Sequence, residues 1–146
     1  MRHLIAILLQ NEAGALTRVT GLISTRGYNI ESLSVAPTND PTVSRVTLVT
    51  TGSDHVIAQI NAQLQKLVDV VAVEDMTSGD HLARELLLIK LQLCADHVEA
   101  VEGLLRRLGG KVLSAKPSSY IVELTSTEVE ISEFITNVAA CCSRFA

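Results

Sequence analysis

Aromatic residues are scarce in this sequence of 146 residues, and tryptophan is absent. The four aromatic side chains are Tyr28, Tyr120, Phe134 and Phe145, so a hydrophobic core must be built mainly from aliphatic residues. Positive charge is also in short supply, because 12 Lys and Arg residues face 16 Asp and Glu residues and the net charge is −4. A weakly acidic chain without tryptophan lacks the basic surface and the stacking platforms used in nucleic-acid binding. We therefore expect no nucleic-acid partner.

The N-terminal apolar run is too short for a targeting or membrane segment. It covers residues 4–9 and is followed by the polar residues Gln10, Asn11 and Glu12. A signal peptide needs about 7–15 apolar residues, and a membrane span needs about 20. The run therefore predicts a strand and no association with a membrane.

Cysteine is sparse as well, with only Cys94, Cys141 and Cys142. An odd number of cysteines, two of them adjacent, suits neither a disulfide framework nor a zinc site. We therefore expect a reducing, cytoplasmic environment and no bound metal.

The first half of the chain predicts the order strand, helix, strand, strand, helix, strand. Hydrophobic residues make up 47% of the sequence, and their spacing changes from β-type runs to helical periods and back. Gly27 follows the first helical period as a stop signal, and Ser53 precedes the second as a cap. The predicted strands are residues 3–9, 30–36, 43–51 and 70–76. The two helices carry apolar residues at Leu16, Val19, Leu22 and Ile23, and at Val56, Ile57, Ile60, Leu64 and Leu67.

A small polar segment separates this half from a second one with a related pattern. We assign residues 1–77 to a first domain, 78–83 to a linker and 84–146 to a second domain. In the second domain, strands are predicted at 85–93, 111–116 and 119–125, with a helix carrying Val98 and Leu105 after the first of them. The fold class is therefore α+β, with two halves of the βαββαβ type.

The end of the second domain departs from this pattern. Thr127 and Glu130 have the spacing of a capping box, which opens a last helix. The helical period then continues through Cys141, Cys142 and Phe145, so we expect the helix to weaken beyond about Ala140 and the fourth strand to be missing.

The connection between the first strand and the first helix offers a candidate binding site. A helix N-terminus presents unpaired N–H groups and a partial positive charge, which suit a carboxylate. Gly14 would let a ligand approach these amides, and Asn11 offers a donor and an acceptor to an amino acid. The same residues could instead only shape the turn, and Asn29 could only satisfy local backbone groups. Spacing alone leaves these interpretations open.

Four segments closely resemble the regulatory (small) subunit family of acetolactate synthase, also called acetohydroxyacid synthase. They are residues 9–16 (LQNEAGAL), 26–33 (RGYNIESL), 35–38 (VAPT) and 66–70 (KLVDV). The resemblance implies an N-terminal ACT domain followed by a ferredoxin-like domain. It also implies a homodimer that binds valine at the interface of its ACT domains. Valine would act there as the feedback inhibitor of valine, isoleucine and leucine biosynthesis.

The resemblance also implies a set of effector-binding residues and a partner. Transferred residue by residue, the valine site consists of Asn11, Gly14, Ala15 and Leu16 of one chain, with Asn29 and Ile30 of the other chain and Ala36 nearby. The partner is a catalytic (large) subunit that carries thiamine diphosphate, FAD and Mg, and whose activity the small subunit raises. This chain is expected to hold no cofactor and to be non-catalytic alone. After about Val138 the similarity to the family ends.

Other candidates are weaker. Cys94, Asp96 and His97 could supply a nucleophile, an acid and a base, but residues so close along a strand end seldom converge as a triad. The histidines lack metal-ligand spacing and are expected at the surface; they are His3, His55, His81 and His97. The alternative function is a free-standing amino-acid-binding ACT module without an enzyme partner. A small ferredoxin-like enzyme is a third, for which the sequence offers no convergent catalytic set.

Overall fold

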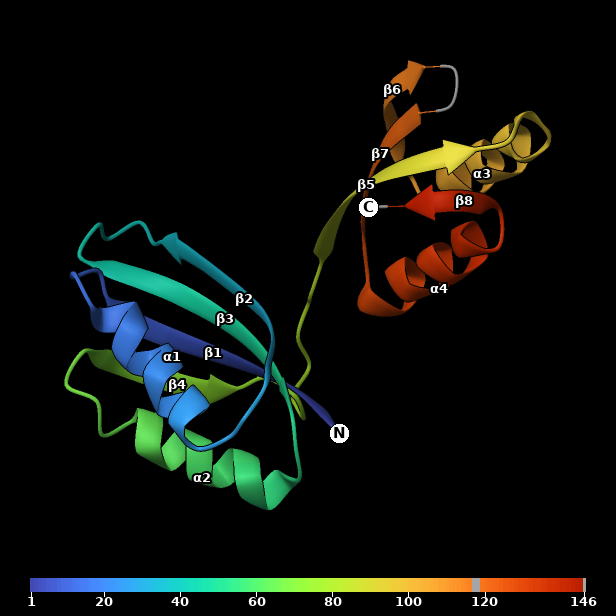
Figure 1. The fold of residues 1–146 in the computed structure, drawn as a ribbon. Helices are drawn as coiled ribbons and strands as arrows, with labels where there is room; N and C mark the ends of the chain where they lie inside the picture. The colour runs from blue at the N-terminus through green and yellow to red at the C-terminus, as the bar shows by residue number, and fades with distance from the viewer. Residues whose placement is uncertain (117–118, 146) are drawn as a thin grey trace. The chain divides into compact units, whose positions relative to one another are not determined.

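The chain folds as two compact units, Met1–His81 and Leu82–Ala146. The computed structural model describes residues 1–116 and 119–145. Each unit combines a four-stranded antiparallel sheet with two helices, which confirms the predicted α+β class (Figure 1). Across the described residues, no helix has both the length and the apolar character needed to cross a bilayer.

The first unit packs two helices against one face of its sheet (Figure 1). The strand order is β2-β3-β1-β4, so β1 and β3 are central and β2 and β4 are edges. The order of elements along the chain is as the sequence predicted. The elements are β1 (Arg2–Gln10), α1 (Ala15–Thr25), β2 (Ile30–Pro37), β3 (Val43–Thr51), α2 (Asp54–Leu64) and β4 (Val70–Asp75).

The core of the first unit lies between the sheet and these two helices. Alternate residues of β1, such as Ile5 and Ile7, point toward the helices and are fully buried. One face of α1 meets them with Val19 and Ile23, at helical spacing. The core is aliphatic, as the scarcity of aromatic residues predicted, and it fixes the position of the β1–α1 connection at the end of the sheet.

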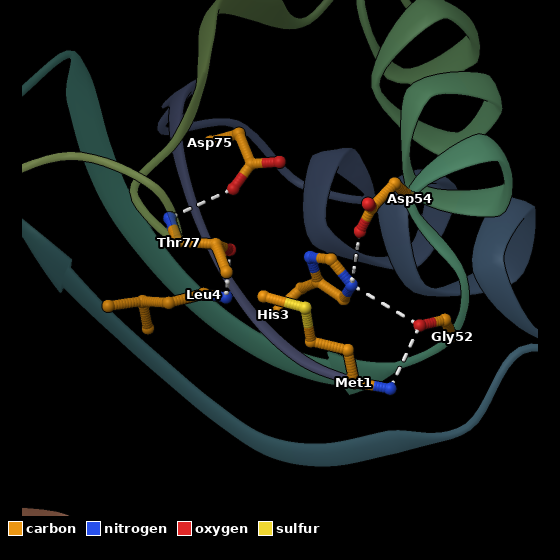
Figure 2. Close-up of polar contacts among 7 residues, drawn as sticks. All are labelled: Met1, His3, Leu4, Gly52, Asp54, Asp75 and Thr77. Atoms are coloured by element: carbon orange, nitrogen blue, oxygen red, sulfur yellow. Dashed lines mark hydrogen bonds and ion pairs between the residues drawn. The ribbon is translucent and has the colours of Figure 1, made fainter.

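Polar contacts hold the opposite end of β1 (Figure 2). The terminal amino group of Met1 donates to the carbonyl oxygen of Gly52 over 3.2 Å, and Nε2 of His3 lies 3.3 Å from the same oxygen. The carboxylate of Asp54 lies 3.7 Å from Nε2. His3 is only 3% exposed, so the expectation of a surface position is wrong for this histidine. It is buried because the odd-numbered residues of β1 face the helices.

The second unit repeats the arrangement of the first. Its strand order is β6-β7-β5-β8, and Phe134 is fully buried in an otherwise mainly aliphatic core. Thr127 and Glu130 form the predicted capping box before α4. The elements are β5 (Glu85–Leu93), α3 (Ala95–Arg107), β6 (Lys111–Lys116), β7 (Ser119–Ser126), α4 (Glu128–Ala139) and β8 (Cys142–Phe145).

The expectation that the second domain lacks its last strand is wrong. The helix ends at Ala139, close to the predicted point, but the backbone does not continue the helical period through Cys141. Strand β8 follows and pairs antiparallel with β5, so that Leu91 lies opposite Phe145. This pairing gives hydrogen-bond partners to an edge of β5 that would otherwise be open. The second unit is therefore a complete βαββαβ fold.

The two sheets also share their irregularities. The pairing of β1 with β4 shifts register between Leu8 and Leu9, and the pairing of β5 with β8 shifts between Gln92 and Leu93. In both units the shift falls near the end of the first strand, before the connection to the following helix. The two halves are therefore related in strand geometry as well as in element order.

Candidate functional site

The β1–α1 loop, residues 11–14, is fixed at its first residue to the turn between β2 and β3. The backbone N–H of Asn11 donates to the carbonyl oxygen of Thr42 over 2.7 Å. Its Nδ2 donates to the carbonyl oxygen of Pro41 over 2.9 Å. Asn11 therefore shapes the turn, which is one of the two roles that the sequence left open. Its side-chain oxygen accepts no hydrogen bond within the described residues.

Gly14 leaves the N-terminus of α1 open. It precedes the helix with a φ of +84°, a left-handed conformation that side chains disfavour. It supplies no capping side chain, and in the part of the chain that the structure describes the N–H groups of Leu16 and Thr17 make no hydrogen bond. Ala15 is buried in the core and anchors the first turn. The arrangement presents free amides and the positive end of a helix to an acceptor such as a carboxylate.

An ion pair that the sequence did not reveal lies beside Gly14. Arg18, one turn into α1, contacts Asp69 in the α2–β4 connection through two nitrogens. Nε bonds Oδ2, and Nη2 donates to Oδ1 over 2.8 Å. A two-point contact of this kind fixes the orientation of a guanidinium as well as attracting it. The third nitrogen, Nη1, lies 3.1 Å from the position that a Cβ atom would occupy on Gly14.

The two groups shift each other's pKa. The hydrogen bond from Arg18 lowers the pKa of the Asp69 carboxyl, against the opposing effect of burial. The hydrogen bond to Asp69 raises the pKa of Arg18, and the charges of Asp69 and Glu12 add to that rise. The Asp69 side chain is 5% exposed and that of Arg18 is 47% exposed. A permanent cation is thus held at the beginning of α1 by a nearly buried carboxylate.

This pair predicts a pH dependence of stability. A carboxyl whose pKa is lower in the folded chain stabilises the fold above its unfolded pKa, about 3.9, and loses that contribution as the pH falls through the folded pKa. We expect Asp69→Asn to be less stable than the wild type at pH 7. Its free energy of unfolding should decline less steeply below about pH 4. Urea denaturation at a series of pH values measures both effects.

Asp80→Asn, which changes an exposed carboxylate that follows β4 near the end of the first unit, is the control for the loss of one negative charge. A decline for Asp69→Asn as steep as that of the wild type would contradict the prediction.

The remaining predicted site residues lie at opposite ends of β2. Ala36 is exposed, and it lies at the end of the sheet where the β1–α1 loop begins. The two are at the same end because Gln10, the last residue of β1, pairs with Val43, the first residue of β3. The carbonyl oxygen of Asn29, at the other end, accepts a hydrogen bond from Thr50, and Ile30 packs on the core. Within one chain, Asn29 and Ile30 are therefore not brought to the loop.

Both units match models of a single protein family. Residues 5–72 match the model described as AHAS small subunit-like ACT domain. Residues 84–141 match the model described as small subunit of acetolactate synthase. The chain belongs to the acetolactate synthase small subunit family. The N-terminal unit is therefore an ACT domain, as the resemblance implied.

Named relatives of this family agree over nearly the whole chain. The chain is 44% identical over 138 residues to the acetolactate synthase isozyme 3 small subunit of Escherichia coli (strain K12), which covers 94% of this chain and 85% of that protein. It is 40% identical over 136 residues to the acetolactate synthase small subunit of Haemophilus influenzae, covering 93% and 83%. The crystal structure of the small subunit from Thermotoga maritima has a similar fold, with a TM-score of 0.82 and 30% identity, covering 100% of this chain and 92% of that chain. As a member of this family, the chain is a regulatory component and is not catalytic by itself.

The second unit of this small subunit makes the corresponding connection with one residue. Cys94 alone joins β5 to α3, and it makes no side-chain capping bond. His97 and Cys94 are joined by a backbone hydrogen bond, in which the N–H of His97 donates to the carbonyl oxygen of Cys94 over 3.0 Å. With Asp96 these residues are exposed on the first turn of α3. Among the described residues, no group of three or more His, Cys, Asp or Glu side chains is arranged to hold a metal ion.

Proposed function

We propose that this small subunit binds valine between the ACT domains of two copies and transmits that state to a thiamine-diphosphate-dependent catalytic subunit. The observation that carries the proposal is the open N-terminus of α1, where Gly14 leaves two backbone amides free beside the fixed guanidinium of Arg18. Free amides and a cation suit the carboxylate of an amino acid. An effector that binds two conformations with different affinity shifts the balance between them, which is what regulation requires.

The edge strand β2 supports the pairing of two copies. Within the described residues β2 pairs only with β3, so its outer backbone groups are open to another strand. Leu33 and Val35 on this strand are 37% and 41% exposed, so both side chains are accessible to a partner. A symmetric partner strand would cover both the backbone edge and these side chains.

The same pairing accounts for the split positions of the predicted site residues. If two β2 strands pair antiparallel about a two-fold axis, the beginning of one strand lies beside the end of the other. Asn29 and Ile30 of one copy would then reach the end of the sheet at which the partner copy has Ala36 and its β1–α1 loop. A site shared between copies thus follows from the strand direction.

Two measurements test this proposal. Isothermal titration calorimetry and light scattering should show valine binding to a dimer, with aspartate, whose side chain carries a second carboxylate, as the control ligand. Pyruvate turnover should be absent with the small subunit alone and present with the matching catalytic subunit alone. Turnover should rise when the two subunits are mixed and fall when valine is added to the mixture.

The outcomes separate the alternatives. Valine binding without any effect on the catalytic subunit would favour a free-standing ACT module. A concentration-independent monomer, or no valine binding, would refute the shared site. Turnover of pyruvate by the purified small subunit alone would refute the non-catalytic assignment.

A further inference from the structure

The guanidinium of Arg18 has two differently used sides. Nε and Nη2 are engaged by Asp69, whereas Nη1 makes no hydrogen bond within the described residues and faces Gly14. Its distance of 3.1 Å to a Cβ position on Gly14 means that any side chain at that position would press against it. Gly14 therefore suits the left-handed backbone conformation at this position and leaves the space between the loop and Nη1 open.

Asp69 is what keeps the guanidinium in that orientation. Its side chain is nearly buried, and its backbone carbonyl accepts a hydrogen bond from the N–H of Gln10 at the end of β1. The carboxylate is thus fixed to the same strand end from which the β1–α1 loop begins. Arg18, with a side chain that is about half exposed, would otherwise distribute over several rotamers.

Two carboxylates act on the guanidinium of Arg18. Asp69 bonds it directly, and Glu12, in the β1–α1 loop, attracts it at longer range. Asp69 occupies one edge of the planar fork, and Glu12 is exposed and not hydrogen bonded to Arg18 in the described residues. The N–H groups of Nη1 thus remain for a further acceptor at the N-terminus of α1.

We propose that Arg18 contacts the carboxylate of the amino-acid effector through Nη1, and that Asp69 is the positioning residue that aims it there. This inference rests on the proposed effector site and adds a side-chain cation to its backbone amides. It assigns recognition of the ligand's carboxylate to the ACT domain of one copy. Residues of the partner copy would contact the rest of the ligand.

The test compares valine with valinamide, which has the same side chain and amino group but no negative charge. The variants are Arg18→Gln/Asp69→Asn, which replaces the ion pair by two amides, and Arg18→Lys, which keeps the charge without the fork. Arg26→Gln, at the far end of α1 and exposed, is the matched control for the loss of one positive charge. Binding of each ligand is measured by calorimetry, and folding by circular dichroism.

We expect the double variant to bind valine about 10- to 100-fold more weakly, the range for a lost hydrogen bond between charged groups. Its affinity for valinamide should change little, so the preference for valine over valinamide should collapse. Arg18→Lys should lose part of that preference, and Arg26→Gln should keep all of it.

An equal loss for both ligands would show that the ion pair only supports the fold, and an unchanged preference would exclude Arg18 from the site; either result overturns the inference. Failure of the wild type to bind valine would instead refute the proposed function, so the two failures are distinguishable. If the double variant does not fold, the preference measured with Arg18→Lys and with Asp69→Asn decides in the same way.

Discussion

Gly14→Asp is expected to abolish valine binding, with a loss of affinity of 100-fold or more, about 2.8 kcal/mol or more. The new side chain would begin 3.1 Å from Nη1 of Arg18, so its carboxylate would occupy the space in front of the free amides of α1. There it would pair with the guanidinium and repel the carboxylate of the ligand. Calorimetry with valine measures the loss directly.

Gly14→Asn separates charge from shape in this experiment. Asp and Asn both tolerate the left-handed backbone better than other side chains, so each should cost about 1–2 kcal/mol of stability at a φ of +84°. Both also fill the same volume, but only the aspartate brings a negative charge. Valine should therefore bind Gly14→Asn more tightly than Gly14→Asp. Wild-type affinity in Gly14→Asp would place the effector elsewhere.

Phe134→Ala is expected to destabilise the second unit by about 3–5 kcal/mol, the usual cost of removing a buried phenylalanine. Phe134 is 0% exposed and is the largest fully buried side chain among the described residues. It lies on α4 in a core whose other members are mainly aliphatic, so few neighbours could fill the vacated volume. Phe134→Leu, which retains most of the volume, should cost much less.

The two separate cores make this experiment specific. Each unit has its own cluster of buried residues, so amide hydrogen exchange should accelerate in residues 85–139 and remain unchanged in residues 3–75. Mass spectrometry of peptic fragments resolves the two regions. Equal acceleration in both regions would show that the units unfold together and would contradict the prediction.

Regular elements with strong periodicity were predictable from the sequence, whereas long-range pairing was not. The continuous apolar run of residues 4–9 and the helical spacing of Val19 and Ile23 are local signals, and both elements occur where the patterns indicated. Gly14 was singled out by its place before a helix, and its positive φ gives a physical reason for a glycine there.

The features that were missed depend on partners distant in the sequence. Strand β8 has only four residues and follows a helical pattern without a break, so its conformation is decided by the free edge of β5 rather than by its own residues. Arg18 and Asp69 are charged residues of ordinary appearance until the fold brings them together. His3 was assigned to the surface because the histidines lack metal-ligand spacing, but it lies on the face of β1 that the helices cover.

The unequal connections after β1 and β5 have a consequence for how this chain can change. The same crossing from first strand to first helix is made with residues 11–14 in one unit and with Cys94 alone in the other. The same fold forms with a connection of either length, so this junction tolerates insertions, because surface loops lengthen at small entropic cost. New recognition properties can therefore be acquired here by exchanging a few residues, while the sheet and helices that support them continue to fold unaltered.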